Sequence, residues 1–171
     1  MLLKCFVLFV LLNFVSVEAI YGGDTVTGNQ YPWMAKINIY GRNSHQRWSA
    51  SCGGTIISKN LILTAAHCVS DSEIISATVT IGNSNPQVGE TININAIKIH
   101  PKHKRIVITN EFQFLLHDLA ILRLAQDLNF DNVTIQPINL PQENYSDDDL
   151  LDRNKTKLSV IGWGKQQKLG M

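Results

Sequence analysis

The chain has 171 residues, a formal net charge of +1 and a hydrophobic content of 44%. That near-neutral balance gives no basis for nucleic acid or an acidic surface as a partner. The length is sufficient for one domain with a substantial core but short for two.

Residues 1–19, MLLKCFVLFVLLNFVSVEA, have the features of a secretory signal peptide. Lys4 stands near the start, an apolar centre follows, and Val17 and Ala19 have the spacing of a signal-peptidase site. The apolar stretch is shorter than the roughly 20 residues that a membrane-spanning helix needs, so a membrane anchor is the weaker alternative. We therefore expect a secreted, extracellular protein whose mature chain begins at Ile20.

The hydrophobic pattern of the rest of the chain favours strands over helices. It is clearest in TININAIKIH, residues 91–100, where apolar and polar residues alternate, so that one face of a strand is buried. Turn-rich pieces such as GNSNPQVG separate the apolar segments. The strands that we expect besides 91–100 are 34–40, 56–65, 75–81, 119–124 and 158–163. Short strands at this spacing predict an all-β fold, an antiparallel barrel or a sandwich.

Two charged stretches are predicted to be exposed. PKHKR at 101–105 is interpreted as a solvated loop. NYSDDDLLDRNK at 144–155 is predicted to be an exposed acidic connector between the main body and the last apolar strand. Its aspartates lack the alternating spacing and the glycine of an EF-hand calcium loop, so no metal site is expected there.

The cysteines and sequons agree with secretion. Cys5 leaves with the signal peptide, so the mature chain keeps Cys52 and Cys68. In an oxidising compartment these two favour one disulfide over two buried free thiols. The N-glycosylation candidates are Asn132, Asn144 and Asn154.

His67 and Asp118 are the candidate catalytic residues. His67 follows the apolar run LILTAA, so its ring would be held on a rigid element. Asp118 directly precedes an apolar run, where a carboxylate needs a partner, since burying an unpaired charge is costly. An aspartate paired with a histidine fixes the imidazole tautomer and leaves the other ring nitrogen free to take a proton. Taken singly, each residue is more often structural than catalytic.

Several segments, in order, resemble the secreted trypsin-like serine proteases of the chymotrypsin family. They are IYGG at 20–23, YPWMAKI at 31–37, SCGGTIIS at 51–58, LILTAAHC ending at 68, HDLAILRL at 117–124 and VIGWGK at 160–165. The resemblance implies a trypsin-like antiparallel β-barrel over residues 20–143, and in residues 156–171 the first strand of an incomplete second barrel. It also implies that His67 is the general base and acid, that Asp118 orients it, and that a Cys52–Cys68 disulfide fixes the histidine loop.

The family pattern breaks in the C-terminal part. The GDSGG segment, which supplies the nucleophilic serine and the oxyanion hole, is not found in these 171 residues. After Asp118 the serines are Ser146 and Ser159, and neither lies between the glycines of a sharp turn. We therefore expect this chain alone to have no peptidase activity. At the other end, Tyr21 replaces the family's valine after Ile20, which puts the usual insertion of that terminus in doubt.

Three functions are compatible with the sequence. The favoured one is a truncated form of a secreted serine endopeptidase that would act on polypeptide substrates and meet protein inhibitors. The alternatives are a non-catalytic homologue with a binding or regulatory role, and a structural secreted β domain unrelated to proteolysis. We expect no cofactor, no nucleic acid partner, no membrane association and no metal site, because His100 and His103 lack further convergent ligands. His45 and His117 match no catalytic position.

Overall fold

The computed structural model describes residues 23–109, 113–131, 133–141 and 159–164. The predicted signal peptide, Ile20, the acidic connector with Ser146, and the three sequon asparagines lie outside these residues. Most of the described residues belong to one unit, Thr25–Trp163. No described helix is long and apolar enough to cross a membrane.

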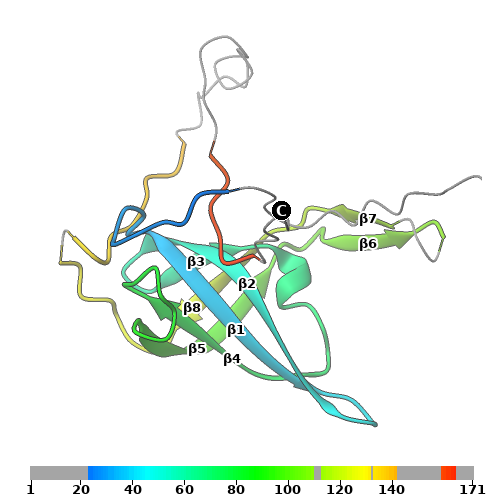
Figure 1. The fold of residues 1–171 in the computed structure, drawn as a ribbon. Coiled ribbons are helices and arrows are strands. Elements are labelled where there is room, and N and C mark those ends of the chain that lie inside the picture. The colour runs from blue at the N-terminus through cyan, green and yellow to red at the C-terminus, as the bar shows by residue number, and fades with distance from the viewer. Residues whose placement is uncertain (1–22, 110–112, 132, 142–158, 165–171) are drawn as a thin grey trace, which may run out of the picture. The chain divides into compact units, whose positions relative to one another are not determined.

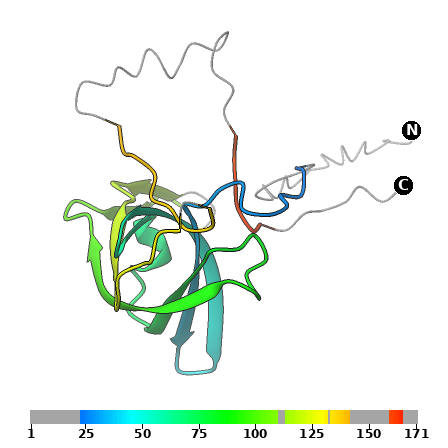
Figure 2. The same cartoon turned by 90° about the vertical axis from the view of Figure 1, so that its left-hand side faces the viewer.

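Six strands of this unit close into an antiparallel barrel (Figure 1), in the order β1-β2-β3-β8-β5-β4. Pairing of β1 with β4 completes the ring, and Figure 2 shows the strands curving around the interior. A separate hairpin pairs β6 with β7. The elements are β1 Met34–Arg42, β2 Arg47–Ser58, β3 Leu61–Thr64, the 3₁₀ helix η1 Ala66–Cys68, β4 Ile74–Ile81, β5 Glu90–Ile99, β6 Lys104–Val107, β7 Gln113–Leu116 and β8 Ala120–Leu124. The expected all-β barrel is confirmed.

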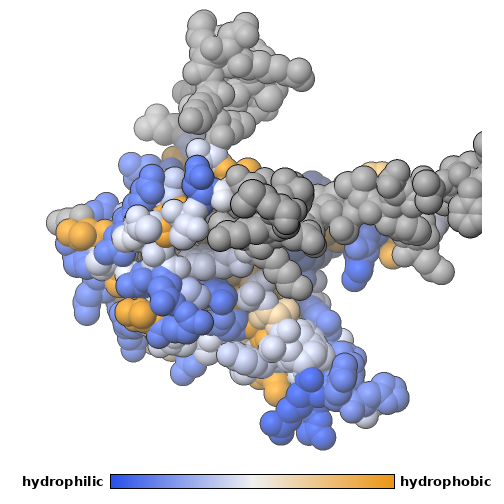
Figure 3. Space-filling model, viewed as in Figure 1, coloured by the Kyte–Doolittle hydropathy of each residue, from blue (hydrophilic) through white to orange (hydrophobic). Residues whose placement is uncertain are grey.

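Alternation along the strands fills the barrel with branched aliphatic side chains. Ile37 and Ile39 on β1, Ile62 on β3, Val79 on β4 and Leu122 on β8 are all buried. Successive strand residues point to opposite faces of the sheet, so the neighbours of these residues along each strand face the outside of the barrel. The surface is mixed, and Figure 3 shows hydrophilic residues gathered at the tip of the β1–β2 hairpin. The core therefore holds β3 and β8, the strands that lead to the candidate site, in a fixed register.

The structure differs from the expected elements at 56–65, at 47–54 and at 101–105. Residues 56–65 are not one strand, because a turn at Lys59 and Asn60 separates the end of β2 from β3. No strand was expected at RWSASCGG, residues 47–54, yet it forms most of β2 because it pairs with β1 along its whole length. The run 101–105 is not wholly a loop, because Lys104 and Arg105 begin β6 and pair with β7.

The segment at 159–163 also differs from expectation. It was expected to lie in a strand at 158–163, but the described residues 159–164 have no strand, because none of the described ladders includes them. A strand needs a neighbour for its backbone hydrogen bonds. The segment is held instead by a side chain, since Trp163 Nε1 donates to the Ser84 carbonyl oxygen over 2.8 Å.

Candidate active site

His67 lies on η1, directly after β3. Thr64 ends β3 and its hydroxyl donates to the Gly53 carbonyl oxygen of β2 over 2.9 Å. The chain then enters η1, where Ala66 is fully buried and anchors the turn, whereas the His67 side chain is 51% exposed. This places the imidazole at the surface on a short, well-anchored element.

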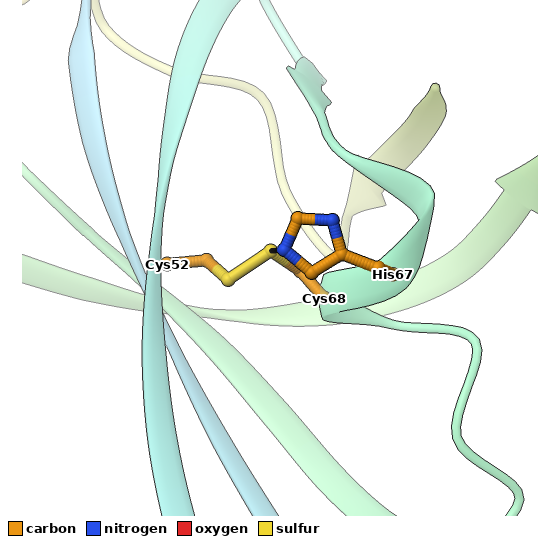
Figure 4. A group of neighbouring side chains, drawn as sticks. All are labelled: Cys52, His67 and Cys68. Atoms are coloured by element: carbon orange, nitrogen blue, oxygen red, sulfur yellow. Dashed lines mark hydrogen bonds between the residues drawn. A yellow bond between two sulfur atoms is a disulfide. The ribbon is translucent and has the colours of Figure 1, made fainter. Parts of the chain in front are cut away.

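A disulfide between Cys52 and Cys68 joins η1 to β2 (Figure 4), as expected. Both cysteines pack against the hydrophobic core. Because Cys68 follows His67 directly, the bridge restricts the backbone that carries the imidazole.

Asp118 reaches His67 because of the antiparallel pairing of β3 and β8. Thr64 at the end of β3 lies opposite Ala120 at the start of β8. Residues just after Thr64 and just before Ala120 therefore meet at the same end of the barrel. His117 has a φ of 49°, in the left-handed region, and the Leu119 N–H donates to its carbonyl oxygen over 2.8 Å, so the chain turns sharply around Asp118 before β8.

Both carboxylate oxygens of Asp118 bind His67. Oδ1 accepts the His67 backbone N–H over 2.8 Å, and Oδ2 lies 2.7 Å from His67 Nδ1. An ionised carboxylate only accepts hydrogen bonds, so Nδ1 carries the proton and, in the neutral ring, Nε2 is the basic nitrogen. Nε2 lies 3.5 Å from Cys68 Sγ. The arrangement is that of an imidazole held in one tautomer and prepared to accept a proton at Nε2.

The environment keeps Asp118 ionised. Its side chain is 24% exposed, and burial by itself would raise its pKa. Hydrogen bonds from the ring and backbone of His67, together with the charges of the His67 and His103 rings, outweigh that effect and hold the pKa of Asp118 below its ordinary value. The carboxylate is therefore available as a hydrogen-bond acceptor over the whole neutral range.

The nearest approach to a metal-ligating cluster among the described residues is Cys52, His67 and Cys68. Its two sulfur atoms are bonded to each other, and a disulfide offers no thiolate to a metal ion. The cluster is therefore a disulfide next to an imidazole. It does not fit a zinc site, which needs deprotonated ligands.

The structure separates the remaining candidates. His45 lies in the β1–β2 turn, where its backbone N–H donates to Asn43 Oδ1. The rings of His100 and His117 stack on each other, with centroids 4.8 Å apart. Ser159 is exposed, and no described contact joins it to His67.

His103, which sequence reasoning set aside, lies against Asp118. Its Nδ1 is 3.9 Å from Asp118 Oδ1, and its side chain is 11% exposed. No local motif marks this proximity, because it depends on the pairing of β6 with β7. The sequence therefore carries no local signal that could have found His103.

The first predicted sequon is partly described. Val133 is exposed, and Thr134 is held in a turn by the Asp131 carboxylate, which accepts backbone N–H groups from Val133, Thr134 and Ile135 and the Thr134 hydroxyl. These hydrogen bonds, the one from the Thr134 hydroxyl first, lower the pKa of Asp131. Glycosylation of Asn132, Asn144 and Asn154 stays a prediction.

Comparison with known proteins agrees with the barrel fold. The family model described as Trypsin matches residues 20–171. The chain belongs to the trypsin family. "Trypsin, alkaline C" of Manduca sexta is 31% identical over 170 residues, covering 95% of this chain and 60% of that protein. This chain therefore spans about 60% of the length of that relative.

Solved structures support the same fold. The structure of GrC is 24% identical with a TM-score of 0.58, covering 74% of this chain and 51% of that chain, a likeness that shows the fold. The scabies mite inactivated protease paralogue S-I1 is 25% identical with a TM-score of 0.53, covering 73% of this chain and 51% of that chain. A trypsin-family barrel is thus present over the described residues.

Proposed function

We propose that this chain supplies the acid–base half of a secreted trypsin-like serine endopeptidase, with His67 as general base and acid and Asp118 as the group that orients it. The observation that carries the proposal is the contact of 2.7 Å between Asp118 Oδ2 and His67 Nδ1, on a chain of the trypsin family. The same carboxylate also binds the His67 backbone, so that both the ring and its peptide are held.

The proposed proton transfers run through His67 Nε2. His67 Nε2 takes the hydroxyl proton of a serine as the serine oxygen attacks the carbonyl carbon of the scissile peptide bond. Asp118 stabilises the imidazolium that forms, and Nε2 then gives the proton to the departing amine. Water repeats the sequence to release the acyl group and restore the serine.

The serine itself comes from outside these residues. GDSGG is not present in the 171 residues, and neither Ser146 nor Ser159 has the setting of an activated nucleophile. We therefore propose that the nucleophile and the oxyanion hole are encoded beyond Met171 and that this chain alone is inactive.

The proposed organisation follows the family. Residues 1–19 are a signal peptide, Ile20 is the mature N-terminus, residues 20–143 carry the first barrel, 144–155 form a connector, and 156–171 open the second barrel. The proposed setting is extracellular, with polypeptide substrates and protein inhibitors as partners.

Two experiments test this proposal. Reading the transcript downstream of codon 171 should reveal a GDSGG-like segment in frame, and a stop codon directly after Met171 would contradict the endopeptidase assignment. Purified 171-residue chain should leave a set of peptide substrates intact. Steady cleavage that a serine-directed covalent inhibitor blocks would refute the claim that the chain alone is inactive.

A non-catalytic homologue is the second candidate, favoured by the similarity to a protein named as an inactivated protease paralogue. It predicts a folded secreted product with a native C-terminus at Met171. Mass spectrometry of the secreted protein distinguishes the two, because the endopeptidase proposal requires a longer product.

A further inference from the structure

Asp118 lies between two imidazoles. His67 contacts it from η1, with Nδ1 2.7 Å from Oδ2. His103 lies near the other oxygen, with Nδ1 3.9 Å from Oδ1. The two carboxylate oxygens thus face different histidines, which come from segments 36 residues apart in the sequence.

The backbone fixes the His103 ring at this position. The His103 N–H donates to the His100 carbonyl oxygen over 2.9 Å, which closes a tight turn before β6. The ring Nδ1 lies 3.1 Å from the Leu116 carbonyl oxygen, at the end of β7. A carbonyl oxygen only accepts, so Nδ1 is protonated and donates. Its hydrogen therefore points into the region just before Asp118.

Partial burial strengthens the influence of His103 on Asp118. The His103 side chain is 11% exposed, against 51% for His67, so solvent screens the His103 ring less. The interaction between two charges weakens as their separation and the local dielectric constant increase. An imidazole that is 11% exposed and 3.9 Å from a carboxylate oxygen therefore interacts appreciably with it.

Few other charges among the described groups face this carboxylate. The His100 and His117 rings stack on each other, and the charges that act on Asp118 are those of His67 and His103. Lys102 is exposed and its backbone N–H donates to His100 Nδ1 over 3.2 Å.

We propose that His103 is a second imidazole partner of Asp118, a positioning residue that helps to keep this carboxylate ionised and fixed for His67. The charge of the His103 ring acts on Asp118 Oδ1. The contact of His103 Nδ1 with the Leu116 carbonyl oxygen links the backbone before Asp118 to the turn before β6. This inference rests on the proposed function, in which His67 needs a fixed, ionised Asp118, but its test does not need catalysis.

The test is a carboxyl titration of the full chain by ¹³C NMR, comparing the unmodified protein with H103N. Asparagine retains a donor near the position of Nδ1 but carries no charge. We expect the pKa of Asp118 to rise by about half a pH unit in H103N, roughly a threefold change in its proton-binding constant. H45N, which alters an exposed histidine of the β1–β2 turn, should leave the titration unchanged. Equal titration of Asp118 in H103N and the unmodified chain would overturn the proposal.

A second measurement covers the case in which H103N does not fold. In H67N, His103 is the imidazole that remains beside Asp118. The Asp118 ¹³Cγ resonance should then show a step at the pH at which the ring resonances of His103 change, and its absence would contradict the proposal. Neither readout involves peptide hydrolysis, so a failure of the proposed endopeptidase function leaves both results interpretable.

Discussion

Gly54 and Gly53 on β2 offer a matched test of how tightly the barrel is packed. A methyl group at Gly54 would lie 2.8 Å from Ile62 Cγ2, 3.0 Å from Ile37 Cδ1 and 3.2 Å from the Leu63 carbonyl oxygen. A methyl group at Gly53 would meet nothing within 4 Å. Ile62 and Ile37 are fully buried, and Ile62 Cγ2 is on a branched carbon that cannot swing away, so the strands must move.

We expect Gly54→Ala to lower the free energy of unfolding by about 1–3 kcal/mol, the usual cost of overpacking a well-filled core. Gly53→Ala should be neutral or stabilise by up to about 1 kcal/mol, because alanine restricts the unfolded chain. Urea unfolding at pH 7 with the disulfide intact, followed by tryptophan fluorescence, measures both values. Similar stabilities for the two variants would refute the close approach of β2 to Ile62 and Ile37.

Three further predictions concern the Cys52–Cys68 disulfide, the Asp118 carboxylate and the core residue Ile62. Replacing Cys52 and Cys68 together by serine should lower the free energy of unfolding by about 3 kcal/mol in urea, the chain-entropy value for a sequence separation of 16, and no change would contradict the restraint ascribed to the bridge. Because the folded pKa of Asp118 is depressed, its stabilisation is complete above about pH 4 and lost as pH falls through the folded value, so thermal melts of Asp118→Asn should lack that acid-side slope. Ile62→Ala should lower the free energy of unfolding by about 2–5 kcal/mol, and a loss below 1 kcal/mol would argue against its full burial.

The sequence predicted most of the barrel because its signals are local. Alternation marked the β5 segment, and short apolar runs between turn residues marked β1, β4 and β8. It failed where packing overrides local preference. RWSASCGG lacks alternating apolar residues, so no strand was expected there, yet it forms most of β2 because its backbone pairs with β1.

The candidate site was predictable in part. The proposed roles of His67 and Asp118 came from resemblance, since a histidine at a strand end and an aspartate before a strand have no local signal of their pairing. Their contact follows from the β3–β8 register, which places Thr64 opposite Ala120. His103 was missed because its approach to Asp118 depends on the pairing of β6 with β7. Neither of these strands was expected from the sequence.

The roles proposed for His67 and Asp118 are tested most directly by the peptidase activity of the product of the complete transcript, compared with its His67→Ala and Asp118→Asn variants. We expect the complete product to cleave peptides. We expect Asp118→Asn to lower kcat by roughly 10⁴-fold, the loss established for this change in the family, and His67→Ala to lower it at least as much. Activity that survives the loss of His67 would contradict the assignment of His67 and Asp118 as the acid–base half of the enzyme.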